Sequence, residues 1–205
     1  MDGVSLAGLA IAVLILAATP GPGVFATIAQ ALSAGFNRTL FLVAGIVIGD
    51  LIYLVLAILG LAVIAQALGE LFTVVRIGGG LYLIWLGIKI WKSKTAFSHP
   101  DQKETNGSVA GALFTGLLIT LSNPKVILFY CGFLPAFVDL KALSSLDIAF
   151  VACVVAGVVV SVLLAYGYLA SKMRLFFSDV ASRRKVNRLA GGTMMAAGVA
   201  AVAKT

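Results

Sequence analysis

Two ionisable residues, Asp50 and Lys125, fall inside long apolar stretches of this sequence. Asp50 follows Arg38 by twelve residues, and Lys125 precedes Phe137 by twelve residues. At 1.5 Å per helical residue, each lies about 18 Å along its helix, near the middle of a bilayer. A charge at that depth costs about 3 kcal/mol by insertion scales, so it is expected to face protein or water. An acid and a base at similar depth predict a pocket for a small polar solute.

Two roles are open for this pair. In the first, Asp50 accepts a proton or binds an amine, while Lys125 binds a carboxylate or acts as the counter-charge. In the second, the two side chains only pair and lock two parts of the protein together. Polar groups expected near the same pocket are Gln30, Tyr53 and Tyr130.

The helices that must carry these charges are predicted to be interrupted. The interruptions are Thr19-Pro20-Gly21-Pro22-Gly23 and Asn123-Pro124-Lys125. Proline removes a backbone donor, and glycine tolerates a change of direction. Freed backbone groups cannot face lipid, so both breaks must be buried or line a wet cavity. Asn123 and Pro124 also fit an N-cap and first helical residue, whose amide end would attract an anion. A structural kink is the simpler alternative for each break.

The composition is that of an integral membrane protein. The 205 residues are 61% hydrophobic and 11% charged, with a mean hydropathy of +1.09, whereas soluble domains carry about 25% charged residues. The net charge of +7 lies in short segments beside apolar runs, which argues against nucleic-acid binding. Cys131, Cys153 and His99 show no metal-ligand spacing, so no metal site is expected. The first apolar run lacks a basic leader, so the whole chain is expected to be mature.

Apolar runs predict an all-α membrane protein with six transmembrane helices, at residues 5–34, 40–67, 72–91, 109–137, 146–175 and 186–203. The first and fourth are the broken ones. The loops on one side hold eleven Lys and Arg residues, and those on the other hold three. By the positive-inside rule the richer side is cytoplasmic, which places both termini outside and the loop 93–107 inside. Losing one weak span would move a terminus.

A weak internal repeat divides this single domain, residues 1–205, into two halves. An offset of 104 aligns Pro20 with Pro124, and an offset of 112 aligns Arg76-x-x-Gly79-Gly80 with Arg188-x-x-Gly191-Gly192. The halves, residues 5–92 and 108–205, hold three spans each and would be inverted relative to one another, with 93–107 as the cytoplasmic linker. Inverted repeats with interrupted helices are a transporter architecture, with the site near the midplane.

The sequence resembles the LysE/RhtB family of amino-acid exporters. The resemblance rests on the Pro20-Gly21-Pro22-Gly23 break, on Gly45-x-x-x-Gly49-Asp50, and on Asn123-Pro124-Lys125-x-x-x-Phe129 with Leu134-Pro135-x-Phe137. It implies a proton-driven exporter in the bacterial inner membrane that needs no cofactor. The site residues it implies are Pro20, Gly21, Pro22, Asp50, Asn123, Pro124 and Lys125. Ala136 departs from the glutamine usual in the family, which leaves substrate preference open.

The sequence therefore predicts a secondary active exporter of amino acids or their derivatives, whose partners are the substrate, protons and the lipid bilayer. Its binding or coupling residues are expected to be Thr19, Pro20, Gly21, Pro22, Gly23, Asp50, Asn123, Pro124 and Lys125. The alternatives are an oligomeric channel, or an exporter of another small solute or a metal ion. An enzyme is not expected because no nucleophile–base pair or metal motif is present. A homo-oligomer is compatible with the sequence.

Overall fold

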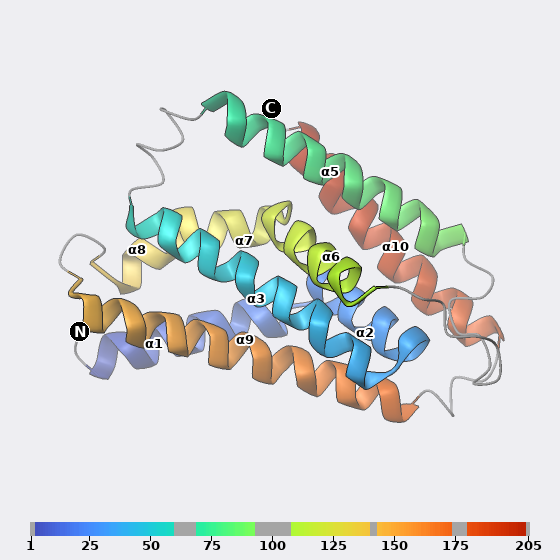
Figure 1. The fold of residues 1–205 in the computed structure, drawn as a ribbon, viewed down its shortest axis with the longest axis horizontal. Coiled ribbons are helices and arrows are strands. Elements are labelled where there is room, and N and C mark those ends of the chain that lie inside the picture. The colour runs from blue at the N-terminus through green and yellow to red at the C-terminus, as the bar shows by residue number, and fades with distance from the viewer. Residues whose placement is uncertain (1–2, 60–68, 93–107, 140–142, 174–179, 204–205) are drawn as a thin grey trace.

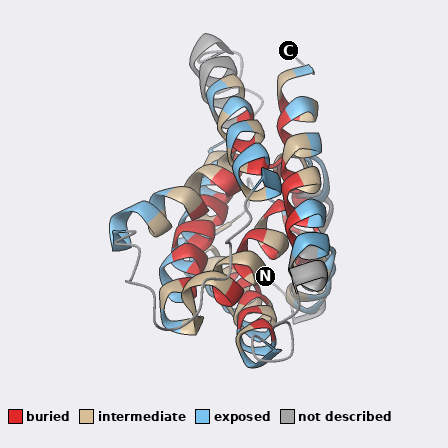
Figure 2. Cartoon of the chain, turned by 90° about the vertical axis from the view of Figure 1, so that its right-hand side faces the viewer, coloured by how far each residue is buried: buried red, intermediate tan, exposed pale blue. Residues whose placement is uncertain are grey.

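The protein is described by a computed structural model that covers residues 3–59, 69–92, 108–139, 143–173 and 180–203. Within these ranges the chain forms helices and no strands, as expected from the sequence. Figure 1 shows them as a bundle in which α5 and α10 form one layer beside the remaining helices. Buried residues line the faces where helices meet, and exposed residues cover the outside (Figure 2).

The predicted break in the first span is confirmed. Helix α1 (Gly3–Ala18) ends before Pro20, and α2 (Pro22–Ala34) begins at the second proline. The two helix axes bend by 58° at this point. Gly35, with a φ of 82°, then turns the chain directly into α3 (Phe36–Ile58). That positive φ favours glycine.

The fourth predicted span is broken into more pieces than the sequence indicated. Helix α6 (Val109–Leu121) is capped by the Ser108 hydroxyl, which accepts from the Gly111 amide at 2.9 Å. After the break come α7 (Pro124–Leu128), the π-helical segment η1 (Phe129–Phe133) and α8 (Leu134–Phe137). Short π-helical segments commonly occur at functional sites.

The remaining helices are α5 (Gly69–Lys92), α9 (Ser145–Met173) and α10 (Val180–Ala203). Helix α10 begins six residues before the predicted start of the last span at residue 186, because the helix includes the basic residues that precede the apolar run. Helix α3 likewise begins at Phe36, four residues before the predicted start of the second span at residue 40. Its predicted end at residue 67 lies outside the described residues, as does the loop 93–107.

Glycines let two helix pairs approach closely. In α3 and α6, a Cβ added at Gly45 would collide with the Leu113 carbonyl, and one at Gly116 would lie 2.9 Å from the Ile46 nitrogen. Gly45 therefore lies on a close-packing face of α3, and α6 is the helix that packs against it.

Helices α5 and α10 run antiparallel with their backbones close together. A Cβ at Gly80 would lie 2.9 Å from the Gly198 carbonyl oxygen, and one at Gly87 would lie 2.6 Å from that of Gly191. Gly80 thus contacts Gly198, and Gly87 contacts Gly191. The pattern is symmetric if Gly80 in α5 is matched with Gly191 in α10, and Gly87 with Gly198, which corresponds to an offset of 111 residues. This offset differs by one residue from the 112 suggested by sequence identity.

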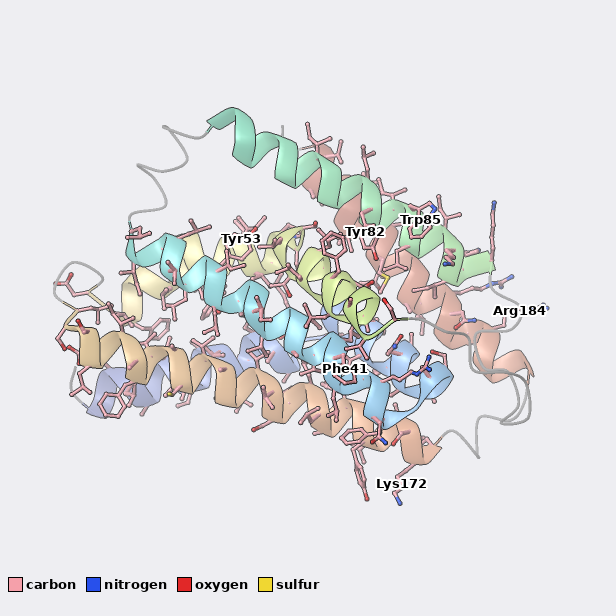
Figure 3. The ribbon with its side chains drawn as sticks, in the orientation of Figure 1. Phe41, Tyr53, Tyr82, Trp85, Lys172 and Arg184 are labelled. Atoms are coloured by element: carbon pink, nitrogen blue, oxygen red, sulfur yellow. The ribbon has the colours of Figure 1, made fainter. Side chains whose placement is uncertain are left out.

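The described helices are compatible with a membrane protein. Helices α3 and α9 are each long and apolar enough to cross a bilayer, and the bent pair α1–α2 would make a third such span. Basic side chains gather at one end of the bundle, where Lys172 and Arg184 are labelled in Figure 3. There Lys89 lies 5.1 Å from the ring centroid of Trp85, and Lys172 lies 5.5 Å from that of Tyr168. Aromatic rings beside basic groups are typical of membrane interfaces.

Candidate functional site

The first break leaves carbonyl groups without their usual helical donors. Pro20 and Pro22 have no N–H, so the carbonyls of Leu16 and Ala18, four residues earlier, lose their partners. The Lys125 ammonium donates to Leu16 O at 2.7 Å and to Thr19 O at 2.8 Å. The Tyr166 hydroxyl, from α9, donates to Ala18 O at 3.0 Å. The end of α1 is therefore closed by side chains that come from the other half of the chain.

Lys125 is well placed electrostatically for this role. A cation at the C-terminal end of a helix is stabilised by the negative pole of the helix dipole. Gly21 makes room for it, because a Cβ there would lie 3.3 Å from Lys125 Nζ. Lys125 thus joins the two predicted breaks directly.

The second break is closed in a different way. The Asn123 side-chain oxygen accepts from the Lys125 amide at 3.1 Å, and Pro124 is the first helical residue of α7. The predicted N-cap is therefore confirmed. The Tyr53 hydroxyl, from α3, donates to the Leu121 carbonyl. Asn123 and Ser122 are both buried, whereas Thr19 and Pro20 in the first break are exposed.

Asp50 lies against the second break. It is 3% exposed, and its neighbour Gly49 packs on Thr120, to which a Cβ would come within 2.7 Å. The Tyr130 hydroxyl and the Lys125 ammonium both act electrostatically on the Asp50 carboxyl. Tyr53 stacks on Tyr130 with ring centroids 6.0 Å apart, so the sequence was right to group both tyrosines with Asp50.

Asp50 and Lys125 do not form an ion pair in the described structure. Lys125 Nζ is hydrogen-bonded to the two carbonyls of the first break, while Asp50 Oδ1 has no hydrogen-bond partner among the described residues. The hydroxyl of Ser122 is likewise buried without a partner in those ranges, whereas the Tyr130 hydroxyl faces the Asp50 carboxyl. The hypothesis that Asp50 and Lys125 serve only as a locking pair is therefore not supported. A buried carboxyl group left in this state is expected to bind a proton, water or a cation.

A cavity of about 550 Å³ lies between α1 and the segment α7–η1–α8. Among the described residues of its lining, Lys125 is the one that carries a charge, and it sits there beside Thr19. The rest of the wall is mainly aliphatic and aromatic, from Ile11, Ile15, Leu128, Phe133 and Phe137. The cavity is formed by both halves of the chain and opens beside the first break.

The predicted site residues separate into three groups. Thr19 and Lys125 line the cavity, while Asp50 is buried apart from its lining. The others shape the two breaks: Pro20, Gly21, Pro22, Gly23, Asn123 and Pro124. Sequence reasoning missed Tyr166, although it follows Tyr53 by 113 residues, close to the repeat offset, and caps the equivalent break. Among the described residues, no group of three His, Cys, Asp or Glu side chains gathers as a metal site.

A helical membrane protein with two broken helices, one beside an open cavity and the other beside a buried carboxyl group, has the features of a membrane translocator. The chain matches the LysE type translocator family over residues 14–205, and it belongs to that family. The family consists of transporters, in agreement with the expectation that the protein is not an enzyme.

Individual relatives extend this comparison. An uncharacterized membrane protein of Synechocystis sp. is 38% identical over 191 residues, which cover 92% of this chain and 90% of the relative. A leucine efflux protein of Klebsiella pneumoniae subsp. pneumoniae is 34% identical over 60% of this chain and 58% of its own length. A leucine efflux protein of Enterobacter sp. is 33% identical, with the same coverage of both chains. No solved structure matches the chain.

Proposed function

We propose that this protein is a secondary active exporter of amino acids, driven by exchange for protons across the bacterial inner membrane. The observation that carries the proposal is the buried Asp50 carboxyl group, which meets the second break and has no ion-pair partner among the described residues. A group of this kind can take up and release a proton when access changes. Membership of a translocator family supports the same conclusion.

The closure of the two breaks supports an inverted repeat of residues 5–92 and 108–205. Tyr53 of the first half caps a carbonyl in the second half, and Tyr166 of the second half caps a carbonyl in the first. In the same way, Gly80 and Gly87 of the first half pack against Gly198 and Gly191 of the second half. Two similar halves around one site allow access to alternate between the two membrane faces.

The end of the bundle that carries the basic side chains is proposed to be cytoplasmic. The loop 93–107 would then be cytoplasmic, and both termini would be outside. This orientation lets a cytoplasmic amino acid enter from the inside and lets protons enter from the outside. The single domain 1–205 would contain the whole transport unit.

Leucine is the first substrate to test, because two relatives are named leucine efflux proteins. Purified protein is reconstituted into liposomes that are preloaded with radiolabelled leucine, threonine, lysine or glutamate. We expect efflux of one class of amino acid that accelerates when a proton gradient is imposed. Asp50→Asn is expected to abolish the effect of the gradient, because an amide cannot exchange a proton at neutral pH.

Asp147→Asn is the matched control, because Asp147 is an exposed acid at the start of α9 that accepts from Ser144. It is expected to transport as the native chain does. The absence of efflux for every amino acid, from folded and inserted protein, would contradict the proposed function. Currents far above carrier turnover would instead favour a channel.

A further inference from the structure

We propose that the cavity beside the first break binds the zwitterionic head group of an α-amino acid with an apolar side chain. Lys125 would hold the carboxylate, and the carbonyls of Leu16 and Thr19 would accept hydrogen bonds from the substrate ammonium group. This assignment rests on the proposed export of amino acids, but it concerns a binding site that is tested without transport.

Lys125 retains capacity for an anion. An ammonium group has three N–H donors, and two of them are used on Leu16 O and Thr19 O. The third has no hydrogen-bond partner among the described residues, and Lys125 lines the cavity. A carboxylate in the cavity would accept this donor in a charge-assisted hydrogen bond.

The carbonyls of the first break complete the head-group site. Each carbonyl oxygen has two lone pairs, and the hydrogen bond from Lys125 uses one on each. A substrate ammonium group can take the second lone pair or replace Lys125 Nζ. It would also face the negative pole of α1, which favours a cation. One break thus offers a donor for the carboxylate and acceptors for the amine.

The remainder of the cavity selects the side chain. Its volume of about 550 Å³ falls within the usual range for small-molecule sites, about 300–1,000 Å³. The walls beyond the head-group site are formed by Ile11, Ile15, Leu128, Phe133 and Phe137. Apart from Lys125, the described lining residues carry no charge, so a charged substrate side chain placed against these walls would lose its hydration without gaining an opposite charge.

A lipid acyl chain is the competing occupant, because Ile15 and Phe133 are 62% and 63% exposed. The position of the charge argues for the amino acid. Lys125 lies twelve residues before Phe137 at the end of α8, about 18 Å along the segment. Lipid head groups lie at the membrane surface, outside a hydrocarbon core about 30 Å thick. A charge at that depth suits a small molecule that brings both of its charges into the protein.

The first test uses native, full-length protein in nanodiscs of phosphatidylethanolamine and phosphatidylglycerol, with binding measured by calorimetry. The ligands are L-leucine, 4-methylpentanoate, 3-methylbutylamine, L-lysine and L-glutamate. The second and third ligands are leucine without its ammonium group and leucine without its carboxylate. Leucine is expected to bind at least about tenfold more tightly than every other ligand, since each lacks a charged hydrogen bond or adds a buried charge.

The second test changes the cavity. Lys125→Met keeps the length of the side chain and is expected to weaken leucine binding at least about tenfold, whereas Lys125→Arg keeps the charge and should lose less. Lys89→Met is the matched control, because Lys89 packs on Trp85 at the end of α5, away from the cavity. Gly21→Ala, which places a Cβ 3.3 Å from Nζ, should weaken binding a few-fold while keeping the ammonium group.

Several results would overturn the assignment. These are equal binding of 4-methylpentanoate and leucine, unchanged leucine affinity in folded Lys125→Met, and binding of oleate where leucine does not bind. The last would make the cavity a lipid site. The two proposals fail separately. Leucine binding that follows the cavity variants without any efflux would remove only the transport function. Efflux that is indifferent to Lys125→Met would remove only this site.

Discussion

The two helix breaks look alike in sequence but are closed differently. In each, a tyrosine from the opposite half donates to a freed carbonyl: Tyr166 to Ala18 and Tyr53 to Leu121. The first break has no cap of its own and depends on Lys125, whereas the second is capped from within by Asn123. The first opens beside a cavity, and the second is buried against Asp50.

This difference suggests a division of work, in which the first break binds the solute and the second carries the proton. The first offers a charge, free lone pairs and space, which are the requirements for holding a solute. The second offers a buried carboxyl group that does not line this cavity. Lys125 belongs to the second break by sequence and to the first by contact. Under the proposed function, Lys125 would connect solute binding physically to the state of Asp50.

The largest effect is expected from separating the second break from α3. Gly116→Ala would drive a methyl group into the Leu42 carbonyl of α3, and over-packing of this kind costs about 3 kcal/mol or more when the backbone must move. Thermal unfolding in detergent is expected to show a strongly lowered Tm or no folded protein. Gly157→Ala in α9 is the control, because a Cβ there meets nothing within 4 Å. A native Tm for Gly116→Ala would contradict the close crossing of α3 and α6.

Asp50→Asn should separate the two roles. Because Asp50 is not part of the cavity lining, leucine binding is expected to stay within about threefold of native, less than the 1.4 kcal/mol of a tenfold change. Gradient-driven exchange should fall to the rate measured in preloaded liposomes that contain no protein. Calorimetry and efflux are measured on the same preparation. Loss of both activities together in a folded variant would refute the division of work.

The two tyrosine caps should differ in strength. Tyr53→Phe leaves the Leu121 carbonyl without its donor beside a buried break and is expected to cost about 2 kcal/mol. Tyr166→Phe is expected to cost about 1 kcal/mol, because water can reach the first break at the exposed Thr19 and Pro20. Denaturant titration of both variants measures the difference. A larger cost for Tyr166→Phe would contradict the view that water reaches the first break but not the second.

The smallest effects should come from the local caps. Asn123→Ala removes the acceptor for the Lys125 amide and is expected to lower the free energy of unfolding by about 1 kcal/mol. Asn123→Asp keeps an acceptor oxygen and should lose much less stability. Thr19→Val should cost less than about 0.5 kcal/mol, because the exposed Thr19 hydroxyl donates to the Ile15 carbonyl within its own helix and to no other group in the described ranges. Thermal unfolding provides both values. An equal cost at the two positions would mean that the second break is no better sealed than the first.

Much of the fold follows from local features of the sequence. The long apolar runs predict the helices, and the proline motifs predict both breaks, because proline acts on the turn that contains it. The N-cap at Asn123 and the close-packing face at Gly45 were also predictable. The π-helical segment Phe129–Phe133 was not, because nothing in its residue types distinguishes it from an ordinary helix.

The candidate site was predicted as a set of residues but not as an arrangement. The sequence by itself determined where the helices break, that both halves contain a break, and that one acid and one base lie deep in apolar segments. Only the tertiary structure decided that Lys125 caps the first break rather than pairing with Asp50, and that Tyr166 closes the carbonyl of Ala18. The reason is physical. A break depends on the backbone within one turn, whereas the side chain that reaches a freed carbonyl depends on how distant helices cross.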